Sequence, residues 1–230
     1  MLSATVTGKE RRRTRLRHPR PFYCLALATV LAMPGVGQPA RLAKDARGAP
    51  PILEVFAGGQ RLGFLPDRAY VAAGGHALTV EFRGTPGVMP RRLSQADGAL
   101  ARGSIRVYYE DLWPGISLTY VTNPRGITES TYSVAAGADV ANIRLHYNVP
   151  VSLQRNGTLR FKFSTGYFTE SSPEAWQEIN GKRVTVKAAF KESNGEVGFQ
   201  LDRYRSEFPL TIDPAIQWDG SRSKIEYEPQ

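Results

Sequence analysis

Residues 178–201 have the sequence Glu-Ile-Asn-Gly-Lys-Arg-Val-Thr-Val-Lys-Ala-Ala-Phe-Lys-Glu-Ser-Asn-Gly-Glu-Val-Gly-Phe-Gln-Leu, and this stretch decides the fold class. Its two Asn-Gly pairs, Asn180-Gly181 and Asn194-Gly195, lie between runs that contain Val, Ile and Phe. Asn and Gly tolerate the positive φ that a two-residue type I′ turn requires, so each pair predicts a β-hairpin. A third pair, Asn156-Gly157, predicts another hairpin of the same kind.

Apolar residues recur at every second position on both sides of this stretch. The runs are Leu78-Val80-Phe82, Ile105-Val107-Tyr109, Ile116-Leu118-Tyr120, Ile143-Leu145-Tyr147, Leu159-Phe161-Phe163, Val184-Val186, Val197-Phe199-Leu201 and Leu210-Ile212. A period of two indicates strands with one buried face. We therefore predict an all-β fold, either an antiparallel β-sandwich or an open barrel built from consecutive hairpins. Two small β subdomains are the alternative to one domain, and the only helical feature expected is a short turn within residues 136–142 opened by Asp139.

The formal net charge of +9 is concentrated at the N-terminus. Residues 1–37 contain seven Lys or Arg and one acid, which leaves 23 of the 30 basic and 20 of the 21 acidic residues elsewhere. A remaining charge of about +3 is too small to indicate neutralisation of phosphates, so no nucleic-acid partner is expected.

The basic segment is followed by an apolar run, Phe22–Met33, and then by Pro34 and Gly35. This order is typical of a signal peptide, because the apolar run is shorter than the roughly 20 residues that span a bilayer. We predict a signal peptide over residues 1–37, a secreted, periplasmic or cell-surface location, and only transient membrane contact. A basic nucleic-acid-binding tail or an uncleaved anchor is the alternative. The single cysteine, Cys24, lies inside this leader, so the mature chain would have no thiol.

The remaining chain divides by composition. Residues 38–51 contain three prolines and no hydrophobic period, which predicts a mobile lead-in to a β domain over residues 52–215. A Pro- and Gly-rich insert at residues 85–103 marks a candidate internal boundary. Leu210 and Ile212 predict a last buried strand ended by Pro214, and residues 216–230 are expected to form a mobile C-terminal tail.

The sequence contains no recognisable catalytic, cofactor-binding or metal-binding motif. His18, His76 and His146 show no metal-ligand spacing, and no glycine-rich nucleotide loop or serine-hydrolase elbow is present. Carboxylates are the remaining candidates for an acid and a base of a glycosidase-like site: Glu110, Asp111, Glu129, Glu174, Glu178, Asp202 and Asp213. Sequence alone places no two of them together.

Tryptophans are the candidate ligand-binding aromatics. Trp113 and Trp218 could stack on sugar rings, as aromatic faces do in binding modules, and Trp218 is expected to be the more exposed because it follows Asp213-Pro214 in the tail. Trp176 lies in an alternating run and is predicted to belong to the core.

Four ordered motifs carry a family resemblance. They are Arg106–Tyr120 with its Trp-Pro-Gly-Ile sequence, Ser130–Asp139 followed by Ile143-Arg144-Leu145, Pro173–Gly181, and Phe208–Pro214 with its Ile-Asp-Pro sequence. Together they resemble the β domain that precedes SBBP-type β-propeller repeats in secreted bacterial proteins. The resemblance implies an exported β domain and supplies no catalytic residues.

The sequence therefore favours an exported, non-enzymatic interaction or structural module of the bacterial envelope or extracellular space. Its partner would be an unknown surface protein or a polysaccharide. The alternative is a carbohydrate-active enzyme that uses paired carboxylates.

Overall fold

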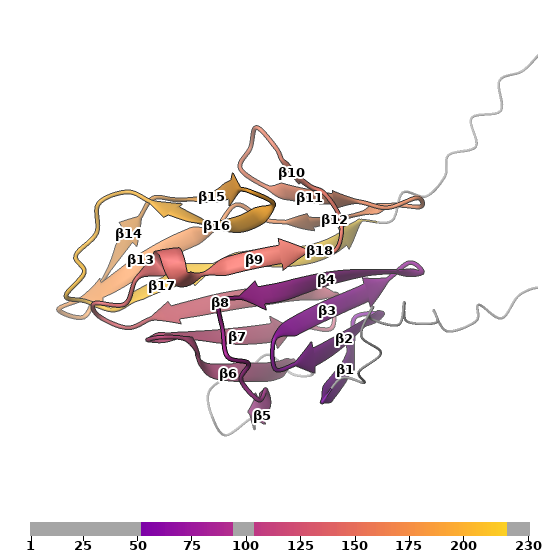
Figure 1. The fold of residues 1–230 in the computed structure, drawn as a ribbon, viewed down its shortest axis with the longest axis horizontal. Coiled ribbons are helices and arrows are strands. Elements are labelled where there is room, and N and C mark those ends of the chain that lie inside the picture. The colour runs from indigo at the N-terminus through magenta and orange to yellow at the C-terminus, as the bar shows by residue number, and fades with distance from the viewer. Residues whose placement is uncertain (1–51, 94–103, 220–230) are drawn as a thin grey trace, which may run out of the picture. The chain divides into compact units, whose positions relative to one another are not determined.

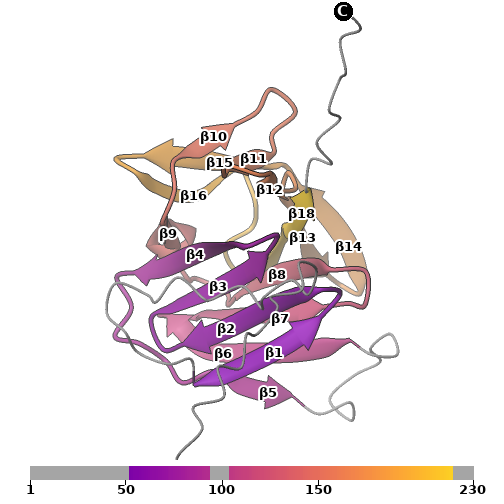
Figure 2. The same ribbon diagram turned by 90° about the vertical axis from the view of Figure 1, so that its right-hand side faces the viewer.

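The computed structural model describes residues 52–93 and 104–219, which form two antiparallel β-sheets packed face to face (Figures 1 and 2). The prediction of an all-β fold is confirmed. Because the sheets do not close into a barrel, the sandwich is the form observed. The predicted leader and lead-in, residues 1–37 and 38–51, lie outside the described residues.

Each sheet joins strands that are distant in sequence. The seven-stranded sheet has the order β1 (Leu53–Ala57), β2 (Gln60–Leu65), β3 (Arg68–Ala73), β4 (His76–Arg83), β9 (Arg144–Tyr147), β16 (Glu196–Leu201) and β15 (Ala188–Ser193). The eleven-stranded sheet has a main path of β10 (Val151–Leu153), β11 (Leu159–Lys162), β12 (Tyr167–Glu170), β18 (Ala215–Asp219), β8 (Ile127–Val134), β17 (Leu210–Asp213), β13 (Glu174–Ile179) and β14 (Lys182–Val186). A branch of β5 (Arg91–Leu93), β6 (Ile105–Trp113) and β7 (Ile116–Thr122) joins it through the β7–β8 pair.

Strand β8 organises the eleven-stranded sheet because it is paired along both edges. β7 lies along one edge, and β17 and β18 follow one another along the other, with Ile212 opposite Tyr132 and Ile216 opposite Thr128. Pro214 joins the two strands, and its carbonyl accepts a hydrogen bond from the Ser130 N–H at 2.9 Å. Beyond β17 the sheet continues to β13, and beyond β18 it continues to β12.

Strand β18 corrects the predicted end of the domain at residue 215. We expected a mobile tail from residue 216, whereas Ile216 is buried and pairs with both Thr128 and Glu170. Pro214 does end β17, since it has no N–H to donate, but the chain stays on β8 and begins a new strand at once. Residues 220–230 lie outside the described part of the chain.

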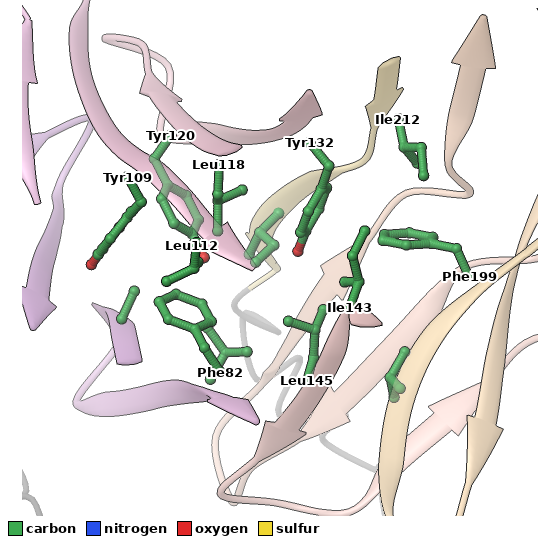
Figure 3. Packing of buried hydrophobic residues seen from close by; sticks show 14 of the residues in the cluster. Phe82, Tyr109, Leu112, Leu118, Tyr120, Tyr132, Ile143, Leu145, Phe199 and Ile212 are labelled. Carbon is green, nitrogen blue, oxygen red and sulfur yellow. The ribbon is translucent and has the colours of Figure 1, made fainter. Parts of the chain in front are cut away.

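The core lies between the two sheets and is continuous. Figure 3 shows Phe82 and Leu145 of the seven-stranded sheet facing Tyr120 and Tyr132 of the eleven-stranded sheet. The Phe82 ring lies 5.4 Å from the Tyr109 ring. Residues on both sides of the candidate boundary at 85–103 therefore pack in the same core. Contacts group the described residues, 52–93 and 104–219, as one unit, which favours one β domain over two.

The Asn-Gly turns differ in type. Asn180 and Gly181 have φ of 53° and 71° and close a two-residue loop between Ile179 and Lys182, which confirms the type I′ prediction. Asn194 and Gly195, with φ of 55° and 76°, repeat it between β15 and β16. Only Gly157 of the third pair has positive φ.

The third pair therefore belongs to a longer turn. The Gly157 N–H donates to Gln154 O and the Gln154 N–H donates to Thr158 O, at 2.9 and 2.8 Å. These bonds describe a type I turn followed by a left-handed glycine. The hairpin between β10 and β11 is confirmed, but its predicted type I′ turn is wrong.

The predicted short turn at Asp139 is present. Val140–Asn142 form a 3-10 helix, and the Asp139 carboxylate accepts a hydrogen bond from the Ala141 N–H at 2.9 Å. Within residues 52–93 and 104–219, no helix is long and apolar enough to cross a membrane.

Candidate functional site

Trp113 is a core residue. Its side chain is 1% exposed, its indole N–H donates to the Arg83 carbonyl at 2.8 Å, and its ring lies edge-on to Phe82. The prediction of Trp113 as a ligand-stacking aromatic is therefore wrong. The physical reason is that β6 points this indole at β4 of the facing sheet, where the hydrogen bond satisfies its polar end.

Trp218 lies half-buried on β18, among aromatic rings from other strands. Its ring centroid is 4.7 Å from Phe168, 5.9 Å from His76 and 6.4 Å from Phe163. We call these four residues the Trp218 cluster. Part of the indole remains accessible, so Trp218 stays a candidate for ligand contact.

Two turns contact the Trp218 ring, each through a glycine. A Cβ atom added to Gly74, in the β3–β4 turn, would lie 2.4 Å from the indole, and one added to Gly166, in the β11–β12 turn, would lie 2.7 Å from it. Such distances are far inside van der Waals contact. The two glycines therefore let turns from both sheets reach the same tryptophan.

Polar groups surround the cluster. His76 Nε2 lies 2.7 Å from Thr165 Oγ1 and 3.5 Å from Ser164 Oγ. The Tyr167 hydroxyl donates to Asp219 Oδ2 at 2.7 Å on the opposite face of the sheet, away from the cluster. The cluster thus joins an aromatic surface to the Thr165 and Ser164 hydroxyls, which can form hydrogen bonds.

An open groove of about 620 Å³ adjoins the cluster at Gly74. It lies between the β1–β2 and β3–β4 turns, with Phe56 on its rim, 61% exposed, and the Arg61 guanidinium 4.8 Å from the centre of that ring. The volume falls within the usual range for ligand sites, about 300–1,000 Å³. The apolar void between the sheets is only about 20 Å³, which holds about one water molecule.

Gln60 forms the polar part of the groove. Its Nε2 donates to the Gly126 carbonyl at 2.6 Å, so the side chain is fixed against the β7–β8 turn. Its buried Oε1 has no hydrogen-bond partner within the described part of the chain. A buried acceptor without a partner is costly, and a bound water or ligand donor beside it would remove that cost.

Of the predicted carboxylates, Glu129 and Asp213 interact with each other. Both lie half-buried on the outer face of the eleven-stranded sheet, and Thr131 donates to Asp213 Oδ1 at 2.8 Å. Burial, and then the negative charge of Asp213, raise the pKa of Glu129. A carboxyl with a raised pKa beside a second acid is the arrangement from which acid–base pairs are built.

The other predicted acids are engaged elsewhere or exposed. Glu110 forms an ion pair with Arg91 at 2.8 Å, and Glu174 lies 3.8 Å from Arg183. Arg183 also covers the ring of Trp176 at 3.6 Å on the outer face. The prediction of Trp176 as core is wrong, since the neighbouring Ala175 and Gln177 are the buried residues of β13.

Sequence reasoning missed the most buried acid, Glu170. It is 1% exposed, and the Tyr147 hydroxyl donates to its Oε2 at 2.9 Å. Burial raises the pKa of Glu170 to about 7, although the Tyr147 hydrogen bond acts in the opposite direction. The missed signal is the position: Glu170 shares the inward parity of Phe168 in β12.

No group of three or more His, Cys, Asp or Glu side chains suited to a metal ion occurs within residues 52–93 and 104–219.

Comparison with known proteins adds a family. A family model described as "Domain of unknown function (DUF7948)" matches residues 100–215, which is half of the chain. No curated protein and no solved structure matches the chain. The matched segment contains β6 to β8 and β17, the centre of the eleven-stranded sheet, but not the groove between the β1–β2 and β3–β4 turns. The chain belongs to the DUF7948 family of domains of unknown function.

Proposed function

We propose that this protein is an exported, non-enzymatic binding module of the bacterial envelope or extracellular space. The leader-like order of residues 1–37 supports export, and the four ordered motifs support a relation to the β domains that accompany SBBP-type repeats. The partner is a polysaccharide or a surface protein.

The groove beside the Trp218 cluster carries this proposal. It combines an exposed aromatic ring, Phe56, with a cation, Arg61, and a fixed amide, Gln60. Aromatic faces stack on the apolar faces of sugar rings, while amide and guanidinium groups hydrogen-bond hydroxyls. This chemistry suits a polysaccharide chain.

Affinity gel electrophoresis against soluble polysaccharides of different linkage tests the site. At least one polysaccharide should retard the protein, and Phe56→Ala should weaken binding by about tenfold, since loss of an aromatic contact costs about 1–2 kcal/mol. Leu153→Ala removes another exposed apolar side chain outside the groove and should bind like wild type. Equal losses in both variants, or no retardation by any polysaccharide, would remove polysaccharide as the ligand of this groove.

Cell fractionation tests export separately. The protein should be recovered outside the cytoplasm with an N-terminus near Gln38, and deletion of residues 1–37 should retain it inside. Recovery of the full-length chain in the cytoplasm would contradict export.

A second candidate function, a carbohydrate-active enzyme, is favoured by the Glu129–Asp213 interaction alone. Retaining and inverting glycosidases need two carboxyl groups roughly 5–10 Å apart beside the substrate. Release of reducing sugar by wild type, abolished in Glu129→Gln and in Asp213→Asn but not in Glu178→Gln, would favour the enzyme. Binding of a polysaccharide without release of reducing sugar would favour the binding module.

A further inference from the structure

A buried hydrogen bond joins the two sheets at Tyr147 and Glu170. Tyr147 is the last residue of β9 in the seven-stranded sheet, and Glu170 is the last residue of β12 in the eleven-stranded sheet. The Tyr147 hydroxyl donates to Glu170 Oε2 at 2.9 Å, and both side chains are buried. The Tyr147 ring also lies 4.5 Å from Phe161 of β11.

Two other hydrogen bonds between the sheets end on peptide carbonyls, while His76 of β4 bonds the Thr165 hydroxyl in the β11–β12 turn at 2.7 Å. Tyr109 donates to Leu65 O at 2.9 Å, and Trp113 donates to Arg83 O at 2.8 Å. Peptide carbonyls do not ionise, so these two bonds are insensitive to pH below the range of tyrosine ionisation. The Tyr147–Glu170 bond differs because its acceptor can gain or lose a proton.

Among the residues that the structure describes, no cation acts on Glu170 to balance an ionised carboxylate. The titratable groups that act on this region are the hydroxyls of Tyr120 on β7, Tyr132 on β8 and Tyr147 on β9, and burial raises the pKa of each. The register neighbours of Glu170 are Leu159 on β11 and Ile216 on β18. Within the described residues, Glu170 forms no ion pair.

We propose that Tyr147 and Glu170 form a pH-sensitive clasp: the neutral carboxyl group packs between the sheets and holds β10–β12 in place, whereas the ionised group, although it keeps the Tyr147 hydrogen bond, is a buried charge that needs solvation and so loosens these strands. An ionised carboxylate in this position must be solvated, and opening of the sandwich at β12 admits water. β12 is held by β11 on one side and by β18 on the other, and β11 is followed only by the three-residue β10. This end of the sheet is therefore the part that opens first.

The direction of the pH effect follows from linkage. Because folding raises the pKa of Glu170 from 4.5 to about 7, its contribution to stability is fully present below pH 4.5 and is lost as pH rises to 7. Across that window the unfolding equilibrium constant should increase about tenfold per pH unit through this residue alone.

Comparison of Glu170→Gln with wild type isolates the contribution of Glu170 ionisation to the pH dependence of stability. The amide cannot ionise and retains an oxygen for Tyr147, so the stability difference between the two proteins should change with pH between 5 and 8. The exposed Glu178→Gln in β13 is the matched control and should follow wild type throughout. Hydrogen exchange at pH 8 should be faster in β10–β12 of wild type than of Glu170→Gln. Identical pH dependence in wild type and Glu170→Gln would overturn the clasp.

Two further measurements keep the inference testable if Glu170→Gln fails to fold. Carbon-13 NMR of wild type labelled at glutamate carboxyl groups should show one group with a titration midpoint near 7. Tyr147→Phe, which keeps the ring and removes the donor, should shift that midpoint upward because the hydrogen bond stabilises the carboxylate. Midpoints that all lie below 5.5 would overturn the proposal.

Discussion

In each type I′ turn, two consecutive residues adopt left-handed backbone conformations, and the second is a glycine. A side chain with a branched Cβ is strained in this region whatever space surrounds it. At Gly181 and Gly195 that strain stands alone, because an added Cβ would meet no atom within 4 Å. At Gly157 an added Cβ would also lie 2.9 Å from Ser172 Oγ.

Gly181→Val and Gly195→Val should therefore each destabilise the fold by about 1–3 kcal/mol, the cost of a strained left-handed residue. Gly157→Val should cost at least as much, since it adds the close approach to Ser172. Thr185→Val, on the exposed face of β14, places the same side chain on a strand and serves as the control. Urea denaturation measures all four variants, and a Gly181→Val protein as stable as the control would contradict the turn assignment.

A substitution at Trp113 tests the contribution of a buried hydrogen bond, the one from the indole N–H to the Arg83 carbonyl. Trp113→Phe keeps an aromatic ring but removes the N–H that satisfies Arg83 O, so it should cost about 1–3 kcal/mol. Trp176→Phe makes the same change on the outer face, where the ring is half-exposed, and should cost clearly less. Equal losses of stability in the two variants would show that the Arg83 hydrogen bond contributes nothing specific.

At the scale of elements, β18 is the decisive strand because it joins β12 to β8. Truncation after Ala215 removes Ile216 from the core and Trp218 from its aromatic cluster. The buried Ile216 contributes about 1.5–3 kcal/mol, and the half-buried Trp218 and the lost pairing with β8 and β12 add to it, so the loss should exceed about 3 kcal/mol. Truncation after Asp219 keeps β18 and is the control, and thermal unfolding of the two proteins gives the comparison. Equal stability would place β18 outside the folded unit.

Local pairs of strands could be predicted from sequence, whereas distant pairs could not. Asn180-Gly181 and Asn194-Gly195 specify their hairpins within a few residues, because turn chemistry and alternation both act locally. The pairing of β9 with β4 and of β18 with β12 depends on packing between segments far apart in the chain. Ile216–Asp219 alternate apolar and polar residues over only four positions, a run too short to predict a strand, and β18 forms where β8 and β12 pair with it.

The same limit applies to the candidate site. Trp218 could be selected by residue type, but its partners come from the β3–β4 turn and the β11–β12 turn. Trp113 has the same residue type and lies in the core, since the facing sheet and not the local sequence supplies its acceptor. Glu170 could have been predicted to face inward from the parity of Phe168, but its contact with Tyr147 depends on the packing of the two sheets.

At the scale of the whole domain, the segment that the family model matches lacks strands against which its own buried residues pack. β1–β4 precede residue 100, yet Phe64 and Phe82 pack on Tyr109 and Tyr120 inside the matched segment. A half-sandwich would expose the inner faces of those strands to water. The folded unit therefore extends from β1 to β18, and its two sheets should unfold together.

Cooperative unfolding distinguishes this single domain from two subdomains. Phe64→Ala truncates the core from the seven-stranded sheet, and Ile212→Ala truncates it from the eleven-stranded sheet. These changes should cost about 3–5 and 2–4 kcal/mol, respectively, because both side chains are buried. In urea, far-UV circular dichroism and tryptophan fluorescence should follow one coincident transition in wild type and in both variants, with only its midpoint lowered. If Phe64→Ala instead produced an early transition that left the other sheet intact, the two sheets would be separate folding units. Coincident transitions follow if each sheet is stable only while the other covers its apolar face.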